Sequence, residues 1–223
     1  MKKDIKKSQK EIDIKKKKDF TFLIIISIII IFVLVLSIWL FNSNKEKQAT
    51  RLFENTLGKI NEFNDQSNIL SKQEMEKEIV NSLDQVIAAY QNTLSGKRAL
   101  FYKGYILYST QNYDKASLIF ETFIKKYNNN YLADKAYYYL SYCYSENNDI
   151  DKAIELLKKY NDRYKKSYFL PTMNFRIASL YKLKGNKEEA ILYYQKIIDE
   201  YPDSPEKDKA KTEIIILKNN IRL

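Results

Sequence analysis

Apolar residues follow two different patterns along this chain. Residues 20–41, FTFLIIISIIIIFVLVLSIWLF, form one apolar block of 22 residues without a charge. At about 1.5 Å per residue, a helix of this length spans the roughly 30 Å hydrocarbon core of a bilayer. From residue 45 onward, apolar residues recur every three or four positions instead, which is typical of amphipathic helices. The pattern predicts an all-α fold in which a single N-terminal transmembrane helix is followed by paired helices.

Residues 42–96 predict a first pair of amphipathic helices that lacks the features of the repeats after it. Ser71 with Glu74 three residues later is a capping box, which predicts the start of the second helix. Ser95-Gly96 predicts the end of that helix. A final helix in residues 205–223, capped by Ser204 at its start, carries one apolar stripe and is predicted to close the far end of the array.

Residues 97–204 repeat one pattern three times. Ala116, Ala153 and Ala190 recur at intervals of 37 residues, inside the similar stretches YDKA, IDKA and KEEA. A small residue at the same place in each copy lets two helices approach closely. A fixed spacing over three copies therefore predicts three tandem helix–turn–helix units.

These three units resemble tetratricopeptide repeats, which are helix–turn–helix modules of roughly 34 residues. Gly104, Tyr113, Ala116, Phe120 and Pro202 stand where that family favours these residue types, whereas Ser141 and Ala178 replace the usual glycine. The longer period, with the turn Tyr201-Pro202-Asp203-Ser204, resembles the variant found in bacterial envelope proteins. The resemblance implies an α-solenoid of antiparallel helix pairs.

The same resemblance gives different roles to two neighbouring stripes on the first helix of each unit. The stripe that contains Leu107 and Tyr144 is implied to pack inside and between units. The other stripe is rich in aromatic rings, and it is implied to line a concave groove that holds peptide segments of a partner. Its members are Phe101, Tyr105, Tyr108, Tyr138, Tyr142 and Phe175. The alternative that these rings only pack against the next helix stays equally open.

Positive charge is concentrated before the apolar block. The formal net charge is +10, and residues 1–19 contain nine lysines against four acidic residues. The positive-inside rule predicts a single-pass protein of the cytoplasmic membrane, with its basic N-terminal tail in the cytoplasm and residues 42–223 outside it, in the periplasm. The block is longer than the apolar core of about 7–15 residues of a cleaved signal peptide, so it is expected to remain as an anchor.

Four consecutive lysines precede the apolar block, with Asp19 between them and the block: Lys15, Lys16, Lys17 and Lys18. They are interpreted either as contacts for anionic lipid headgroups or as a topology signal alone.

The sequence offers little catalytic chemistry. It contains no histidine and one cysteine, Cys143, which is predicted to be a buried structural thiol. The acidic pair Asp199-Glu200 is predicted to be solvated charge on a helix surface. Neither a glycine-rich phosphate loop nor a metal-ligand spacing is present, so no enzyme activity, metal, cofactor or small-molecule substrate is predicted. Basic residues do not alternate with the tyrosines in one stripe, which argues against nucleic-acid binding.

The whole layout resembles the YfgM-like ancillary subunits of the bacterial SecYEG translocon. This resemblance implies a non-catalytic interaction module whose partners are membrane proteins or exported polypeptides, and a role in protein export or in handing exported proteins to chaperones. Two alternatives stay open: a structural scaffold in cell-envelope or division-site assembly, and a non-catalytic regulatory subunit of a membrane complex.

Overall fold

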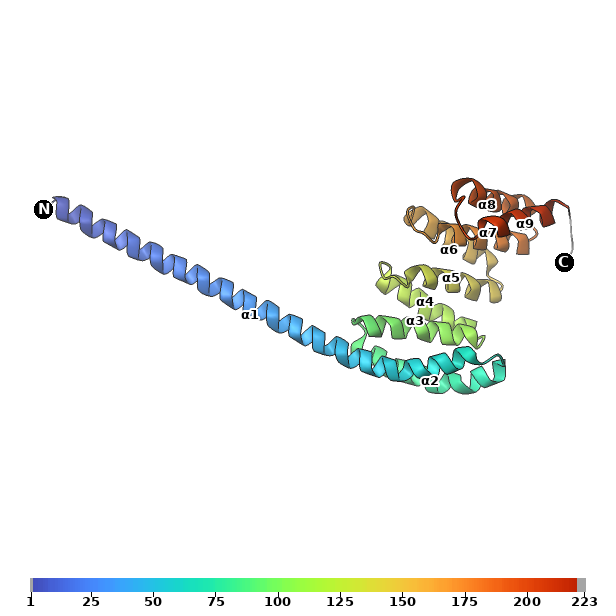
Figure 1. The fold of residues 1–223 in the computed structure, drawn as a ribbon, viewed down its shortest axis with the longest axis horizontal. Helices are drawn as coiled ribbons and strands as arrows, with labels where there is room; N and C mark the ends of the chain where they lie inside the picture. The colour runs from blue at the N-terminus through green and yellow to red at the C-terminus, as the bar shows by residue number, and fades with distance from the viewer. Residues whose placement is uncertain (1, 220–223) are drawn as a thin grey trace. The chain divides into compact units, whose positions relative to one another are not determined.

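The computed structural model describes the backbone of residues 2–219 and the side chains of residue 20 and residues 22–219. Over this range the chain folds into nine α-helices without a strand, so the predicted all-α class is confirmed (Figure 1). Contacts divide the chain into two units, residues 1–48 and residues 49–223.

The first helix, α1 (Lys2–Asp65), runs without interruption through the apolar block and the first predicted amphipathic helix. The described apolar side chains from Phe20 to Phe41 are all exposed, with fractions between 37% and 66%. Ser27 and Ser37 donate their hydroxyls to backbone carbonyls of the preceding turn, at 2.7 and 2.8 Å. By length and composition, α1 is a candidate to cross a membrane.

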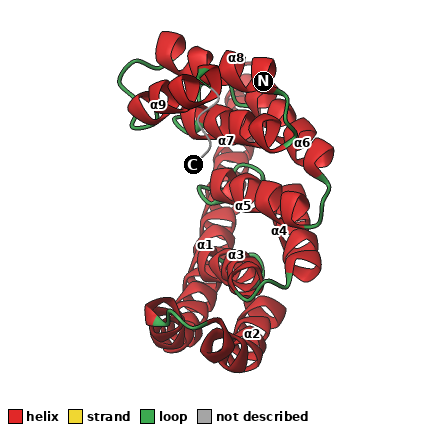
Figure 2. Ribbon diagram, turned by 90° about the vertical axis from the view of Figure 1, so that its right-hand side faces the viewer, coloured by secondary structure: helices red, strands yellow, loops and turns green. Residues whose placement is uncertain are grey.

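The eight helices that follow are short and antiparallel to their neighbours. They are α2 (Ile69–Tyr90), α3 (Leu94–Ser109), α4 (Tyr113–Tyr127), α5 (Ala133–Glu146), α6 (Ile150–Arg163), α7 (Leu170–Leu183), α8 (Lys187–Glu200) and α9 (Lys207–Lys218). Each of them packs against the next, and α3 also contacts α5, which contacts α7. Within the described residues no such packing joins α4 to α6 or α6 to α8. The helices α3, α5 and α7 therefore form one continuous layer, and α4 and α6 lie to one side of it (Figure 2).

Small residues lie where the paired helices touch. Ala116, Ala153 and Ala190 are completely buried, as their common phase predicted. Gly104 on α3 lies directly against the ring of Phe120 on α4. Close approach at these points brings α3 to α4, α5 to α6 and α7 to α8. The buried apolar residues form one cluster across α3 to α7 and a second cluster across α7, α8 and α9.

The turn inside each unit has the same backbone geometry. Gln111, Asn148 and Gly185, at the 37-residue spacing, have φ values of 65°, 64° and 79°. After each, the next amide donates to a carbonyl in the last turn of the preceding helix; Asn186 N to Tyr181 O is one of these bonds, at 2.9 Å. This is a Schellman ending, which requires a left-handed residue. Only the third copy has the glycine that suits that conformation best.

Two tyrosines tie each turn between units to the one before it. Tyr127 donates its hydroxyl to Gln91 O at 2.9 Å, and Tyr164 donates to Asn128 O at 3.1 Å. Both bonds join residues 36 positions apart. In these two cases the tyrosine at the end of α4 or α6 satisfies a backbone acceptor about one period earlier, which links the period in the sequence to the stacking of the helices.

Three helix ends differ from the sequence expectations. The capping box at Ser71 does not start α2, because Asn68 accepts a hydrogen bond from Leu70 N and begins that helix earlier. Ser95 and Gly96 do not end α2; they lie in the first turn of α3, where Gly96 packs against the carbonyl of Tyr90. Ser204 does not cap α9, which begins at Lys207. At the first two ends, a nearby residue or a tertiary contact prevails over the local signal.

Candidate functional site

Five of the six predicted groove residues are half-buried aromatic side chains on the layer formed by α3, α5 and α7. We call this set the aromatic face: Tyr105, Tyr108, Tyr138, Tyr142 and Phe175. Neighbouring rings make contact, with centroids 6.2 Å apart for Tyr108 and Tyr142 and 5.0 Å apart for Tyr138 and Tyr142. Leu107 and Tyr144, on the neighbouring stripe, are buried. Whether the aromatic face binds a partner stays a prediction.

The sixth residue, Phe101, is not part of this surface. Its side chain is only 4% exposed, so the expectation that it lines a groove is wrong. The ring packs edge-on against Phe120 and Phe123 of α4, at centroid distances of 5.8 and 5.9 Å, and Tyr139 of α5 covers it at 6.2 Å. Phe101 therefore belongs to the core.

Tyr139 lies at the centre of the ring cluster and was missed from the sequence. Its centroid is 5.5 Å from that of Tyr105, 5.1 Å from that of Tyr108 and 5.8 Å from the stacked ring of Phe120. The 37-residue period would have pointed to it, because Tyr102 occupies the same place in the preceding unit. Tyr139 supports the aromatic face from beneath and joins it to the core.

Two hydroxyls of the aromatic face, those of Tyr108 and Tyr138, lie in a poorly solvated environment. Tyr138 and Tyr142 share a hydrogen bond of 3.1 Å between their hydroxyl oxygens. Burial raises the pKa of Tyr108 to about 12, and burial together with the bond to Tyr142 raises the pKa of Tyr138. The raised pKa values move Tyr108 and Tyr138 further from ionisation, so these two groups offer rings and neutral hydroxyls rather than negative charge.

A small pocket opens at one end of the aromatic face. It has a volume of ≈ 160 Å³ and lies between α5 and α7, beside the start of α9. We call it the Arg176 pocket; its lining is Tyr138, Tyr142, Thr172, Phe175, Arg176, Ser179, Glu206 and Lys209. Glu206 accepts a hydrogen bond from Thr172 at 2.6 Å.

Arg176 forms one wall of this pocket, although its side chain is only 9% exposed. Its guanidinium carbon lies 3.4 Å from the centroid of the Tyr142 ring, in cation–π contact. Nη2 donates to Ser145 Oγ at 2.6 Å, and Nε donates to Ser141 Oγ at 3.3 Å. Burial lowers the pKa of this guanidinium, although an arginine stays charged. Ser141, which stands where the repeat family favours glycine, is one of its partners.

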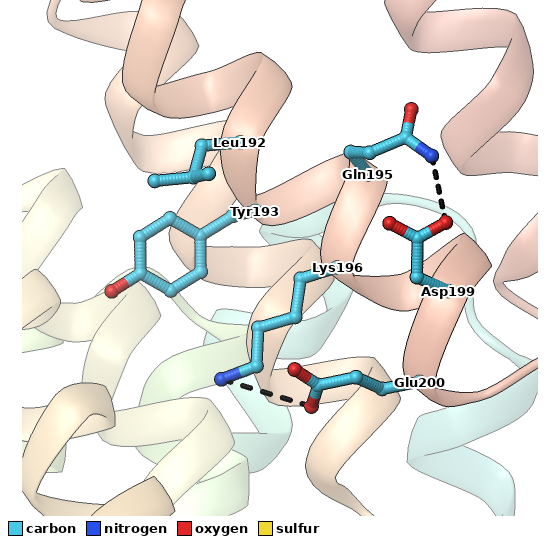
Figure 3. A pocket seen from close by; sticks show the side chains of 6 residues that line it. All are labelled: Leu192, Tyr193, Gln195, Lys196, Asp199 and Glu200. Carbon is cyan, nitrogen blue, oxygen red and sulfur yellow. Dashed lines mark hydrogen bonds and ion pairs between the residues drawn. The ribbon is translucent and has the colours of Figure 1, made fainter.

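A hollow on the surface of α8 is of a different kind. Leu192, Tyr193, Gln195, Lys196, Asp199 and Glu200, all from α8, line a volume of ≈ 370 Å³ (Figure 3). Gln195 donates to Asp199 at 2.9 Å, and Lys196 pairs with Glu200 at 3.9 Å. The acidic pair is thus engaged by neighbours on its own helix surface.

The remaining sequence predictions concern groups elsewhere. Cys143 is buried and unpaired, as predicted, and burial raises the pKa of its thiol to about 12. The described residues contain no group of three or more His, Cys, Asp or Glu side chains that could hold a metal ion. The side chains of Lys15, Lys16, Lys17 and Lys18 lie outside the described residues, so their contact with lipid stays a prediction.

Comparison with known proteins identifies the repeats. The family model described as a tetratricopeptide repeat-like domain matches residues 18–218. No curated protein is similar enough in sequence to count as a match.

Solved structures with a similar fold include one described as TPR-like repeats. Nearly identical TPR-like repeats of a putative kinesin light chain from Podosopora anserina superpose with a TM-score of 0.53 at 15% identity, over 79% of this chain and 84% of that chain. MamA from Desulfovibrio magneticus RS-1, residues 41 to the end, gives a TM-score of 0.50 at 14% identity, over 78% of this chain and 94% of that chain. At these identities the likeness concerns the fold.

Proposed function

Because the chain belongs to the tetratricopeptide repeat-like family, we propose that it is a membrane-anchored interaction module whose aromatic face binds segments of partner polypeptides. The observation that carries this proposal is the row of half-buried rings on α3, α5 and α7. Rings at such positions supply large contact area at a small cost in conformational entropy, and a tyrosine hydroxyl can also form a hydrogen bond at the polar end of the ring.

Exposed apolar surface supports the membrane anchor. Monomeric soluble proteins rarely expose apolar patches larger than a few hundred Å². The block from Phe20 to Phe41 exposes apolar side chains all along its length, which lipid would cover. The nine lysines in residues 1–19 favour a cytoplasmic N-terminus and an extracytoplasmic repeat domain. Lys15 to Lys18 would then face anionic headgroups at the inner surface.

The proposed cellular role is assistance to protein export, through contact with exported polypeptides or chaperones beside the translocon. The anchor would keep the repeats close to the site where such chains emerge, and the aromatic face would bind them through apolar side chains. A scaffold in cell-envelope or division-site assembly, and a regulatory subunit of a membrane complex, are the alternatives. They predict different partners and the same mode of binding.

Site-specific crosslinking in intact cells tests both the surface and the role. A photo-crosslinking residue in place of Tyr138 should capture a defined set of polypeptides, which mass spectrometry identifies. The same residue in place of Leu192, which is 66% exposed on α8, serves as the control and should capture few of them. Translocon subunits, chaperones or exported proteins would support the export role, whereas cell-wall or division proteins would support the scaffold. Equal capture from both positions would contradict the proposed surface.

Topology has its own test. Protease added outside the cytoplasmic membrane, after the outer barrier is opened, should digest residues 42–223 and leave a tag on the N-terminus intact. Loss of the N-terminal tag with a protected repeat domain would reverse the proposed orientation.

A further inference from the structure

Arg176 is positively charged, but no acidic side chain among the described residues forms an ion pair with it. Its hydrogen-bond partners, Ser141 and Ser145, are neutral, and Tyr142 offers only a ring face. Glu146 attracts the guanidinium from beyond ion-pair distance. Glu206 also lines the pocket, but its carboxylate accepts a hydrogen bond from the neutral hydroxyl of Thr172 and forms no ion pair with Arg176. Burying a charge without an opposite partner is costly, so such a group is unusual in a folded chain.

Packing alone does not require this charge. One unit earlier, the equivalent position holds Tyr139, whose ring packs against Tyr105 of α3 at 5.5 Å. Arg176 makes the corresponding contact with Tyr142 of α5. Two units earlier the position again holds a tyrosine, Tyr102. An uncharged ring thus fills this place in two of the three units, and only the unit with the pocket has a cation there.

The guanidinium has hydrogen-bond donors left unused. Nε and Nη2 are used by α5, while Nη1 has no hydrogen-bond partner among the described residues and is not sealed off from solvent. Lys209, exposed on α9, adds a second positive charge at the rim. A planar guanidinium binds carboxylates more strongly than neutral acceptors, because both charge and geometry contribute.

We propose that the Arg176 pocket binds the carboxylate of an internal aspartate or glutamate in a partner segment that lies along the aromatic face. This inference rests on the proposed function and specifies the partner's chemistry. The pocket lies between the tyrosines of α3 and α5 on one side and Lys209 of α9 on the other. A partner segment that contacts the tyrosines as well as Lys209 must pass over the pocket. The residue that it places in the pocket is therefore internal to the segment and not its end. Tyr138 and Phe175 would contact the residues on either side.

The test uses the full chain in lipid nanodiscs and three pools of peptides. Two pools have acetylated and amidated ends, randomised flanking positions without acidic residues, and either Glu or Gln at the centre. The third pool has Gln at the centre and a free C-terminal carboxylate. Mass spectrometry measures which peptides the protein retains. Hydrogen bonds to charged groups lead us to expect about tenfold more retention of the Glu pool than of the Gln pool.

Two variants assign that preference to the pocket. Arg176→Tyr restores the residue type of the other two units, so it should fold while the ratio of Glu to Gln retention falls to about one. Arg163→Met removes an arginine that lies 5.4 Å from the Tyr164 ring, away from the Arg176 pocket, and should leave the ratio unchanged. Equal effects of the two variants would show a general charge effect and overturn the inference.

The outcomes separate the inference from the proposed function. Equal retention of the Glu and Gln pools, with loss of both in Tyr138→Ala, overturns the carboxylate inference and leaves the aromatic face as a binding surface. Preference for the free C-terminus overturns the choice of an internal residue. Retention of no pool by the unmodified protein counts against the proposed function itself.

Discussion

A methyl group added at Gly104 tests the packing inside the first repeat. An ideal Cβ built on Gly104 would lie 2.8 Å from Cε1, 3.0 Å from Cζ and 3.1 Å from Cδ1 of Phe120. The Phe120 ring is completely buried, stacked on Tyr139 with centroids 5.8 Å apart and edge-on to Phe101 at 5.8 Å. The ring cannot turn away without disturbing these contacts. Gly104→Ala must therefore separate α3 from α4 or strain the ring.

Two opposing effects set the size of the change in stability. Overpacking a close-packed core typically costs about 1–3 kcal/mol. Alanine in the middle of a helix recovers about 0.5–1 kcal/mol relative to glycine. The cost of the clash exceeds the gain in helix propensity, so Gly104→Ala should destabilise the repeat domain by about 1–2 kcal/mol. For a domain of this size, that lowers the Tm by about 2–8 °C.

Gly58 provides a matched control for the same substitution. It also lies within a helix, α1, but nothing stands within 4 Å of an added Cβ. Gly58→Ala should therefore gain only the helix propensity of alanine and stabilise by about 0.5–1 kcal/mol. Thermal unfolding of the full chain in detergent, followed by circular dichroism at 222 nm, measures both variants.

The two shifts should have opposite signs. Phe120→Leu, which removes the edge of the ring, should lessen the cost of Gly104→Ala, because the two substitutions act on one contact. A rise in Tm for Gly104→Ala equal to that for Gly58→Ala would refute the proposed close contact between α3 and α4.

Other features of the repeats give further expected outcomes. Gln111→Gly should stabilise by about 0.5–1 kcal/mol, because φ is 65° there, and Gly185→Ala should destabilise by a similar amount, because φ is 79°; opposite signs in urea unfolding would contradict the Schellman geometry. Tyr164→Phe removes the bond to Asn128 O and should cost about 1 kcal/mol in the same assay; unchanged stability would mean that the bond between units contributes nothing. The raised pKa of Cys143 leaves about a thousandfold less thiolate below pH 9 than in an unperturbed thiol; iodoacetamide at pH 8 should therefore react readily only after unfolding, and fast reaction in the folded state would contradict this burial.

The sequence alone determined the class and the periodicity of this protein. Helix formation depends on the spacing of apolar residues over a few turns, so the amphipathic stripes were readable. The three alanines at 37-residue intervals identified the repeats, because close contact of paired helices requires a small residue at the same phase in each copy. The uncharged block in residues 20–41 identified a candidate for a membrane-spanning helix, because the length and composition of a segment are local properties of the sequence.

Only the tertiary structure decided which aromatic rings are covered. Phe101 and Tyr138 occupy equivalent positions one period apart, and the sequence assigned both to one surface. Phe101 is buried because rings of α4 and α5 close over it, whereas Tyr138 stays half-exposed beside the Arg176 pocket. The contact between Arg176 and Tyr142 could not be predicted from the sequence either. Helical periodicity specifies the direction in which a side chain points along its own helix, but burial depends on which residues the neighbouring helices bring to that place.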